Sequence, residues 1–565
     1  MLPIVVLKFG SSVLGSAADL PLVVDEVYRR LREGVRVIAV VSAFAGETDR
    51  LLARARDILG EGAAPAAVAA FVATGELQSA ALLTGTLCGA GIAARMSDPR
   101  DIGLMVKGEP LEADPVGIDQ GAIETLFVDH TVLVLPGFFG MDAHGRVALL
   151  GRGGSDLSAL FVAGELGSEC HLVKDVPGVF DRDPALGVRG ARRYAVIPWA
   201  VAANVAGPLI QPRALAHAAR SRTPFTVSCA NGALETRIAD DAVPRWGPTE
   251  EPTVRLRVVL LGCGVVGGGV YERLVADTNH ANIVAVVTRH PEDLIRRGVP
   301  AALASGDLGQ ALRGDVDLVI EALSDVEPAA SVIAAALSEG KRVISANKAA
   351  ITARWAKLGG YLREPERRLW IGATVGGAVP VLETLARLQG RVRAVRGVIN
   401  GTCNYVLEEL AAGRSFGEAV RGAQAAGFAE SDPERDLSGM DAADKLSLIA
   451  YAAFGAYVPT TSIPIRGIDG VPGEAGEGVW RLIGSATRAG DDVTLGVAPE
   501  RIARDSFLGR TAGADNRVEI VLEDGTTVRL AGQGAGRAPT CLAIMGDLHE
   551  VLRRQARRGA VNAWI

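Results

Sequence analysis

The sequence has few aromatic residues, no excess of positive charge and no closely paired cysteines. Phe, Trp and Tyr make up 5% of the 565 residues, so aliphatic side chains must supply most of a core. The formal net charge of −6 excludes a global basic field of the kind that draws a chain to nucleic acid or anionic lipid. The six cysteines form no Cys-x-x-Cys pair, which argues against a zinc site or disulfide framework and favours free thiols in a reducing cytoplasm.

Long hydrophobic runs are also missing. The longest apolar stretch, residues 63–73, is far shorter than the roughly 18 residues of a membrane span. The N-terminus is apolar but has no basic start, and Lys8 interrupts it, so it resembles a buried strand rather than a signal peptide. We therefore expect a cytoplasmic enzyme that acts on small molecules and binds neither membrane nor nucleic acid.

The length predicts two to four domains of roughly 100–200 residues each. The clearest break lies between Thr236 and Thr253, where acidic residues and prolines cluster and apolar residues are few. We expect a first domain at residues 1–239, a linker at 240–253, a nucleotide-binding domain at 254–390, a catalytic and dimerisation domain at 391–530, and a returning segment at 531–565.

Strands and helices alternate on both sides of this break. Before it, the pattern predicts strands at residues 3–9, 35–42, 131–136 and 169–173 and helices at 22–33 and 158–166, which indicates an α/β sandwich. After it, strands at 255–262, 283–288, 316–322 and 342–346 and helices at 265–276 and 328–339 form a βαβ series typical of a Rossmann domain. From Arg391 the pattern becomes mixed, which predicts an inserted α+β domain, and a last helix is expected at 540–554.

A Gly-x-Gly-x-x-Gly segment lies between the first strand and helix of the second series. Gly262 permits the tight turn, Gly264 lets the backbone approach a pyrophosphate, and Gly267 lets helix and strand pack closely. The helix that starts at Val265 would offer the unpaired amides of its first turn, including that of Val266, to the phosphates. The segment predicts a dinucleotide site; the alternative is a glycine-rich turn that binds nothing.

The end of the next strand bears on which dinucleotide binds. An acidic residue there would bind a ribose 2′-hydroxyl, but the sequence has Thr288 and Arg289. Because arginine can accept a 2′-phosphate, we favour NADP over NAD, with Arg289 as the contact. The alternative is a solvated surface arginine.

Further motifs follow in a fixed order. They are Ser345-Ala346-Asn347-Lys348, the glycine turn 373–380, Asn400-Gly401-Thr402-Cys403-Asn404-Tyr405, Glu430-Ser431-Asp432-Pro433 with Asp436, Gly439, Asp441 and Lys445, and Gly532-Gln533-Gly534-Ala535-Gly536. Together these segments resemble homoserine dehydrogenases over residues 255–557. Cys403, where the family usually has Thr, and Ser324, where a glycine is common, depart from that pattern without removing a catalytic group.

Asp441 and Lys445 are four residues apart in a predicted helix at 441–454, beside its apolar face. Alcohol oxidation needs a base for the hydroxyl proton, and a sheltered Lys445 can take this role. Without the surrounding motifs, the pair would be a surface ion pair worth about 0.3–0.5 kcal/mol. Asp441 and Glu430 would hold the substrate ammonium by charge-assisted hydrogen bonds.

The resemblance implies further roles. It places Lys348 near nicotinamide and substrate, adds Asp436 and Thr402 to the substrate contacts, and packs the loop that ends at Gly536 against the cofactor. It also implies a backbone site for a monovalent cation, with Val375, Gly377 and Val379 as ligands.

The N-terminal half resembles aspartokinases over residues 3–239, which implies the amino-acid-kinase fold. The motifs are Lys8-Phe9-Gly10, Thr74-Gly75-Glu76 before a helix, Gly151-Arg152-Gly153-Gly154-Ser155-Asp156 at a helix start, and Asp175-Val176-Pro177-Gly178-Val179-Phe180. Phosphoryl transfer needs positive charge and amide donors around the phosphates. Lys8 would bind phosphate, Glu76 and Arg152 would clamp aspartate, and Ser155, Asp156 and Asp175 would complete a site for ATP and Mg²⁺.

Three positions depart from the aspartokinase pattern. Gly10 is followed at once by Ser11, Pro208 stands where a lysine is usual, and Ala185 stands where an arginine is usual. Loss of two phosphate-facing cations should weaken charge stabilisation by several kcal/mol unless Arg182, Arg189 or Arg213 compensates. Two alternatives remain: a competent kinase, or a non-catalytic module for binding or assembly. Small regulatory βαββαβ domains are absent from the pattern, so in-chain feedback inhibition is not expected.

The leading hypothesis is a bifunctional enzyme of amino-acid biosynthesis on the way to threonine and methionine. A non-enzymatic NADP sensor is an alternative, but Asp441, Lys445 and Glu430 argue against it. An aspartate-semialdehyde dehydrogenase would need a cysteine nucleophile, and no cysteine-centred motif with a histidine partner is found. The resemblance suggests a homo-oligomer, a dimer or tetramer, formed through the domain after Arg391.

Overall fold

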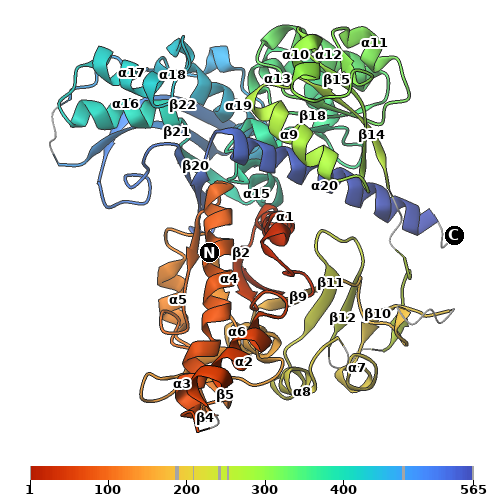
Figure 1. Cartoon of the computed structure of the whole chain (residues 1–565). Helices are drawn as coiled ribbons and strands as arrows, with labels where there is room; N and C mark the ends of the chain where they lie inside the picture. The colour runs from red at the N-terminus through yellow and green to blue at the C-terminus, as the bar shows by residue number, and fades with distance from the viewer. Residues whose placement is uncertain are drawn as a thin grey trace.

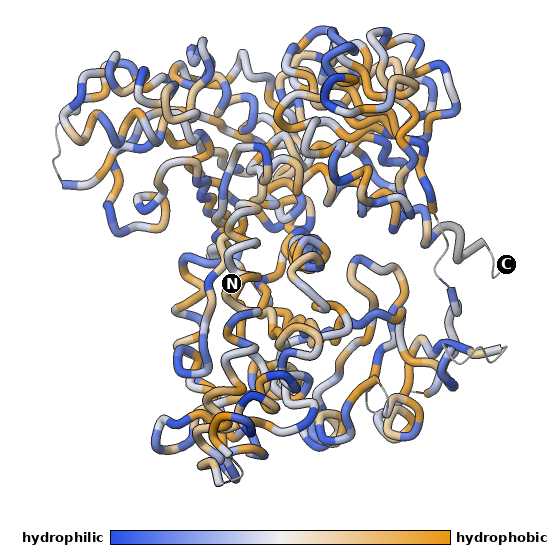
Figure 2. The backbone as a smooth tube through the Cα atoms, in the orientation of Figure 1, coloured by the Kyte–Doolittle hydropathy of each residue, from blue (hydrophilic) through white to orange (hydrophobic). Residues whose placement is uncertain are grey.

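The computed structural model describes residues 2–60, 62–184, 190–207, 209–239, 243–250, 254–473 and 477–562. Ala185, Arg189, Pro208 and parts of the expected linker lie outside the described residues. The N-terminal and C-terminal halves form separate sets of sheets that meet along helices α1 and α20 (Figure 1). Apolar segments gather in the strands and inner helix faces, and polar segments lie on outer loops (Figure 2).

The N-terminal half is built on a nine-stranded sheet of order β13-β10-β12-β11-β9-β1-β2-β6-β3. Its central strands, β1 (Ile4–Phe9), β2 (Arg36–Val41) and β9 (Glu169–Lys174), are parallel and almost fully buried, as their continuous apolar runs predict. The other strands are β3 (Ala94–Met96), β6 (Val132–Pro136), β10 (Tyr194–Ile197), β11 (Phe225–Cys229), β12 (Glu235–Ile238) and β13 (Arg245–Trp246).

Helices cover both faces of this sheet. Helices α1 (Leu20–Arg32) and α4 (Thr74–Gly89) pack on one face, and α6 (Gly154–Leu166) and α8 (Pro212–Ser221) on the other. The α/β sandwich expected from the sequence is confirmed. Two boundaries differ: α6 begins at Gly154 rather than at 158, and Thr74-Gly75-Glu76 forms the first turn of α4 instead of preceding it. Periodicity misses such starts because a glycine-rich turn has no apolar pattern.

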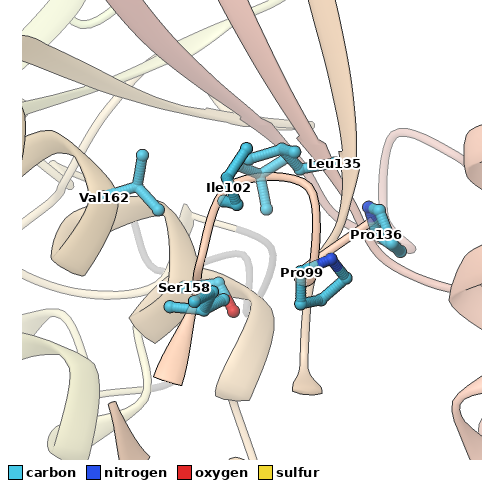
Figure 3. Close-up of a pocket in the computed structure, with 8 residues that line it drawn as sticks. Pro99, Ile102, Leu135, Pro136, Ser158 and Val162 are labelled. Atoms are coloured by element: carbon cyan, nitrogen blue, oxygen red, sulfur yellow. The ribbon is translucent and has the colours of Figure 1, made fainter. Parts of the chain in front are cut away.

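A smaller four-stranded sheet of order β5-β4-β7-β8 borders the sandwich. It contains β4 (Met105–Glu109), β5 (Glu112–Gly117), β7 (Phe139–Met141) and β8 (Val147–Leu149), and α2 (Glu47–Leu59) and α3 (Pro65–Val72) lie nearby. By length and composition, the joined segment Pro65–Gly89 could cross a membrane, and 44% of its apolar 18-residue window is buried inside the domain. A void of about 10 Å³ near Ile102 and Leu135 is apolar and holds little more than a water molecule (Figure 3).

The nucleotide-binding sheet of the C-terminal half has six parallel strands in the order β16-β15-β14-β17-β18-β19. These are β14 (Leu256–Leu261), β15 (Ala281–Val287), β16 (Ala304–Ser305), β17 (Leu318–Glu321), β18 (Arg342–Ser345) and β19 (Leu369–Trp370). The order reverses between β14 and β17, which is the crevice where doubly wound sheets bind ligands. The Rossmann prediction is confirmed, with α9 (Val265–Ala276) at its expected residues and α12 (Val326–Ser338) near them.

The second sheet of this half is antiparallel, with order β22-β21-β20-β23-β24. Its strands are β20 (Val392–Val398), β21 (Val479–Ala489), β22 (Asp492–Ile502), β23 (Asp515–Leu522) and β24 (Thr527–Gln533). Helices α16 (Gly401–Ala411), α17 (Phe416–Ala425), α18 (Glu434–Leu437) and α19 (Met440–Phe454) follow β20, and α19 packs against β21 and β22. The expected change to mixed α+β structure after Arg391 is therefore observed.

The last helix, α20 (Arg537–Asn562), connects the Rossmann domain with the N-terminal half (Figure 1). It begins earlier and runs further than expected because it packs on α9, on the turn η4 (Gly372–Thr374) and on α1. On α1, the buried Arg32 donates to Asp547 at 2.5 Å and pairs with Glu550 at 3.1 Å. The N-terminal half is thereby attached to the helix that closes the nucleotide domain.

Candidate active site

The glycine turn after β14 has the geometry that close approach of a ligand requires. Gly262 has φ +86°, and a Cβ there would lie 2.5 Å from the carbonyl oxygen of Ala322. A Cβ on Gly267 would lie 2.0 Å from the carbonyl oxygen of Gly262, so this position must be glycine for helix and strand to pack. At Gly264 a Cβ would meet nothing within 4 Å, and no side chain caps α9. The helix therefore presents its amides to open space.

This turn forms one wall of a cleft of about 800 Å³. Val265, Val266 and Ala322 line it near the turn, and Lys348, Glu430 and Lys445 from other segments also line it. A cleft of this size accommodates a drug-sized or cofactor-sized molecule. The glycine turn and the two lysines found in separate sequence motifs therefore face one space.

Arginines and aspartates line the cleft beside the glycine turn. Arg289 follows β15, its side chain is 80% exposed, and its Nη1 lies 3.6 Å from Asp325 Oδ2. Arg297 also lines the cleft and donates from Nη1 to the carbonyl oxygen of Cys263 at 2.8 Å. The sequence predicted Arg289 but missed Arg297, since an arginine after α10 (Pro291–Arg296) belongs to no motif.

Asp441 lies between two lysines that line the cleft. Lys348 Nζ is 2.8 Å from Asp441 Oδ1, and Lys445 Nζ is 2.9 Å from Oδ2. Lys445 also donates to the carbonyl oxygen of Ile399 at 2.7 Å. The Lys445 side chain is 10% exposed and that of Lys348 29%. The surface ion pair offered as the alternative is excluded, because Asp441 and Lys445 are buried.

The two ammonium groups control the charge of Asp441. Burial alone would raise the pKa of this carboxyl, but Lys445 and Lys348 outweigh that effect and hold the pKa well below its usual range. In return, the Asp441 carboxylate raises the pKa of Lys348. The cluster thus contains a permanent carboxylate and carries net positive charge when both lysines are protonated.

A second carboxyl group lies beside this cluster. Asn400 Nδ2 donates to Asp436 Oδ1 at 2.7 Å and to Asp441 Oδ2 at 2.8 Å, which connects the two acids. Burial and then repulsion from Asp441 raise the pKa of Asp436. Thr402 Oγ1 donates to the carbonyl oxygen of Phe428 at 2.6 Å and lies 3.3 Å from Asp436 Oδ2. Asn400 was part of a recognised motif, but its link between the acids has no signal in the sequence.

Lys348 is positioned by a buried network at the ends of β17 and β18. Ser345 Oγ donates to Glu321 Oε2 at 2.5 Å, and Asn347 N donates to Ser345 Oγ at 3.1 Å. Asn347 then caps α13 (Lys348–Ala353) through the amide of Ala350. Burial raises the pKa of Glu321 to about 7. Glu321 belongs to none of the recognised sequence motifs, so its role was not predicted.

The remaining residues expected at the site lie around the cleft. Glu430 is exposed in the loop after α17 and lines the cleft. Gly534 and Ala535 line it from the other side, and Gly536, with φ +118°, follows them immediately before α20. The loop ending at Gly536 therefore lies beside the cleft.

The turn expected to hold a cation lies where the two halves meet. Gly377 has φ +54°, and its carbonyl oxygen accepts from Tyr28 Oη at 3.4 Å. The Val379 carbonyl oxygen accepts the amide of Val381 at 2.8 Å, and Val375 is buried. Each of these oxygens keeps a second lone pair. Among the residues that the structure describes, no group of three His, Cys, Asp or Glu side chains could hold a metal ion.

The N-terminal half has its own cluster of charges. Lys8 Nζ lies 2.8 Å from Asp156 Oδ1 in the first turn of α6, and Ser155 Oγ lies 2.8 Å from Ser42 Oγ. Glu76 is buried, accepts from Ala43 N at 3.3 Å, and has a pKa that burial raises to about 7. The structure brings these residues together, whereas Arg152 and Asp175 are exposed.

Comparisons with known proteins also assign the N-terminal and C-terminal halves to different families. Residues 380–549 match the family model for homoserine dehydrogenase, residues 262–370 match the homoserine dehydrogenase NAD-binding domain, and residues 3–224 match the amino acid kinase family. A homoserine dehydrogenase of Synechocystis sp. is 30% identical over 321 residues, which cover 53% of this chain and 73% of that protein.

Two further relatives have the same name. A homoserine dehydrogenase of Mycobacterium tuberculosis is 35% identical over 267 residues, or 45% of this chain and 60% of that protein. The crystal structure of a homoserine dehydrogenase from Thiobacillus denitrificans aligns with a TM-score of 0.49 and 26% identity, covering 54% of this chain and 74% of that one.

Proposed function

The chain belongs to the homoserine dehydrogenase family, and we propose on that premise that it interconverts L-homoserine and L-aspartate 4-semialdehyde with NADP. The observation that carries this proposal is the shared cleft: the glycine turn after β14 lines the same space as Lys348 and Lys445, the two lysines that pair with Asp441. Hydride chemistry needs a proton-transferring group beside the bound nucleotide, and this cleft provides both.

The open space at Gly264 and the uncapped start of α9 fit a dinucleotide pyrophosphate. When bound, the nicotinamide supplies the hydride acceptor or donor. Gly262, Gly264, Val265, Val266 and Gly267 would hold the phosphates, and Arg289 at the rim would meet the 2′-phosphate of NADP. NAD lacks that phosphate and would therefore bind without the Arg289 contact.

Lys445 is the group proposed to exchange a proton with the substrate. An ammonium group has three N–H donors. Two of them meet Ile399 O and Asp441 Oδ2. The third can meet the substrate oxygen, which would fix the position of the hydroxyl or carbonyl group. During reduction this ammonium would donate a proton to the developing alkoxide, and during oxidation the neutral amine of Lys445 would accept the hydroxyl proton with its lone pair.

Lys348 and the acids would position the rest of the substrate. Asp441 already accepts from Lys348, Lys445 and Asn400, so its main role is to orient the two lysines. Glu430 at the rim, with Asp436 and Thr402 deeper in the site, is the better candidate to contact the substrate ammonium and neighbouring groups.

A spectrophotometric assay with homoserine and each nicotinamide cofactor tests this proposal. We expect homoserine-dependent reduction of NADP, at higher kcat/KM than with NAD. Cofactor binding without any turnover of homoserine would contradict the proposal and favour the alternative of an NADP-sensing protein. The matched control is L-serine, which lacks one methylene and should not reach the nicotinamide from the same ammonium contact.

Two properties of the family remain proposals for this chain. A monovalent cation would bind the carbonyl oxygens of Val375, Gly377 and Val379, and activity measured in K⁺, Na⁺ and tetramethylammonium salts would test it. A homo-oligomer, either a dimer or a tetramer, would form through the domain after Arg391, which contains the five-stranded sheet. Light scattering of the full chain would test this assembly.

A second function is favoured for the N-terminal half. Lys8 and Asp156 are in contact at the start of α6, with Glu76 buried nearby. This arrangement supports phosphoryl transfer from ATP to the side-chain carboxylate of L-aspartate, with Arg152 and Ser155 as further contacts. Mg²⁺ would be held mainly by the nucleotide phosphates with Asp156 or Asp175, since Mg²⁺ needs only one or two protein carboxylates. Formation of acyl phosphate from ATP and aspartate is the test.

A further inference from the structure

Lys174, which no sequence motif singled out, lies at the centre of the N-terminal site. It is the last residue of β9, and its Nζ lies 3.1 Å from Asp156 Oδ2, on the carboxyl group whose other oxygen meets Lys8. Strands β1 and β9 are parallel neighbours, so Lys8 and Lys174 reach the same edge of the sheet. Ligands of open α/β sheets bind at the carboxyl ends of the strands.

The three side chains form a buried cluster with net positive charge. Lys8, Asp156 and Lys174 are all less than a tenth exposed. Burial raises the pKa of Asp156, but both lysines outweigh this effect and lower it below its usual value. Burial and the neighbouring charge of Lys8 lower the pKa of Lys174. One carboxylate between two ammonium groups leaves one positive charge that a bound anion would neutralise.

The choice of lysine at these positions is unusual for this chain. The sequence has 59 lysines and arginines, and only seven of them are lysines, namely Lys8, Lys107, Lys174, Lys341, Lys348, Lys357 and Lys445. Four of the seven form the two lysine–aspartate–lysine clusters. Most cationic residues of this chain are arginines, but the residues that contact these two buried aspartates are lysines, whose ammonium group is compact and rotatable.

The buried side chain of Glu76 is an independent indication that the N-terminal site binds a ligand. It is 2% exposed, yet its Oε2 atom has no hydrogen-bond partner in the described structure. Lys8 acts electrostatically on this carboxyl and lowers its pKa against the larger effect of burial. A buried polar atom without a partner is costly, and a ligand group that donates to it would remove that cost.

We propose that Lys174 binds the transferred phosphoryl group of ATP together with Lys8, as the second ammonium of the N-terminal site. This inference rests on the proposed kinase function and adds a residue to it. In the reaction, an oxygen of the aspartate side-chain carboxylate forms a bond to the γ-phosphorus while the bond from that phosphorus to the ADP oxygen breaks. Lys8 and Lys174 face the negative charge on the γ-phosphoryl oxygens, and Asp156 holds both amines in place.

The proposal is tested in the full chain with Lys174→Met, which keeps the length and removes the charge. Acyl phosphate formed from ATP and L-aspartate is measured, with Lys107→Met on the exposed strand β4 as the matched control. We expect kcat to fall by about 100-fold or more in Lys174→Met, with KM for aspartate nearly unchanged, because loss of one charge-stabilising donor costs about that much. Lys107→Met should behave as the wild type, and Lys174→Arg should recover part of the rate.

Two further measurements keep the outcomes distinct. Thermal unfolding and far-UV circular dichroism of the same samples show whether the N-terminal half of each variant is folded, and homoserine oxidation reports on the C-terminal half. If the wild-type chain forms no acyl phosphate, the kinase function fails, and calorimetric binding of MgATP then tests Lys174 alone, with at least a tenfold loss of affinity expected in Lys174→Met. A rate and a MgATP affinity in Lys174→Met within twofold of the wild type would overturn the role of Lys174, as would absence of MgATP binding by the wild type.

Discussion

Each half of the molecule holds an aspartate between two lysines, but the two clusters differ in their access to solvent. Asp441 pairs with Lys348 and Lys445, which line a cleft of about 800 Å³, and the Lys348 side chain is 29% exposed. Asp156, with Lys8 and Lys174, is closed in, with side chains that are 5% to 9% exposed. The same ionic unit can therefore serve a broad cofactor cleft or a compact anion site, depending on the space around it.

The sharpest way to separate the two clusters is to remove Lys445. We expect Lys445→Met to lower kcat for homoserine oxidation by about 10²- to 10⁴-fold, the range for a general acid–base group. NADP binding, measured by fluorescence titration, should be nearly unchanged, because the glycine turn holds the nucleotide. Equal losses in kcat and cofactor affinity would show that this lysine is structural. Lys8→Met, made in parallel, should leave homoserine oxidation intact.

Arg32 tests whether the two halves are independent. It is buried and pairs with Asp547, Glu550 and Glu383 across the interface. Removal of one partner of a buried ion pair costs about 3–5 kcal/mol, so Arg32→Met should lower the midpoint of thermal unfolding by several degrees. Since Asp547 also accepts the amide of Gly372, beside the cleft, KM for NADP should rise. Arg50→Met, at an exposed ion pair, is the control and should change neither property.

Each half also buries one glutamate whose pKa is raised to about 7, Glu76 and Glu321. A raised pKa means that the folded chain binds the proton more tightly than the unfolded chain. The bound proton therefore stabilises the folded chain fully below about pH 4.5, and this stabilisation is lost as the pH rises through 7. Because the pKa of Glu321 is raised from 4.5 to about 7, the contribution to the free energy of unfolding is about 3 kcal/mol.

The variant Glu321→Gln should remove that dependence. We expect its midpoint of thermal unfolding to rise relative to the wild type between pH 5 and pH 8. If the midpoints of variant and wild type change in parallel with pH over this range, Glu321 does not take up a proton there. Glu339→Gln, at an exposed position, is the control.

The smallest expected effect lies at the rim of the cleft. Arg289 is 80% exposed, so its contact with a 2′-phosphate is weakened by solvent. We expect Arg289→Ala to weaken NADP binding by about tenfold, or ~1.4 kcal/mol, and NAD binding by less than twofold. A preference for NADP that is unchanged in the variant would assign the discrimination to another residue, with Arg297 the next to test.

Much of the site could be predicted because its signals are local. The turn from Gly262 to Gly267 is a short segment whose function depends on adjacent residues, and Asp441 and Lys445 are one helical turn apart. Other contacts carry no local signal. Asn400 connects Asp436 and Asp441 over about 40 residues of sequence, and Glu321 reaches Lys348 only through Ser345 and Asn347.

The sequence by itself determined the central strands of the two large sheets, the dinucleotide turn and the lysine at 445, because periodicity and glycine placement depend on residues a few positions apart. The tertiary structure decided which distant groups meet: Lys348 with Asp441, Lys174 with Asp156, and Arg32 with Asp547 across 515 positions. These pairings follow from the strand ends that come together at a sheet edge and from the packing of α20, which no local pattern specifies.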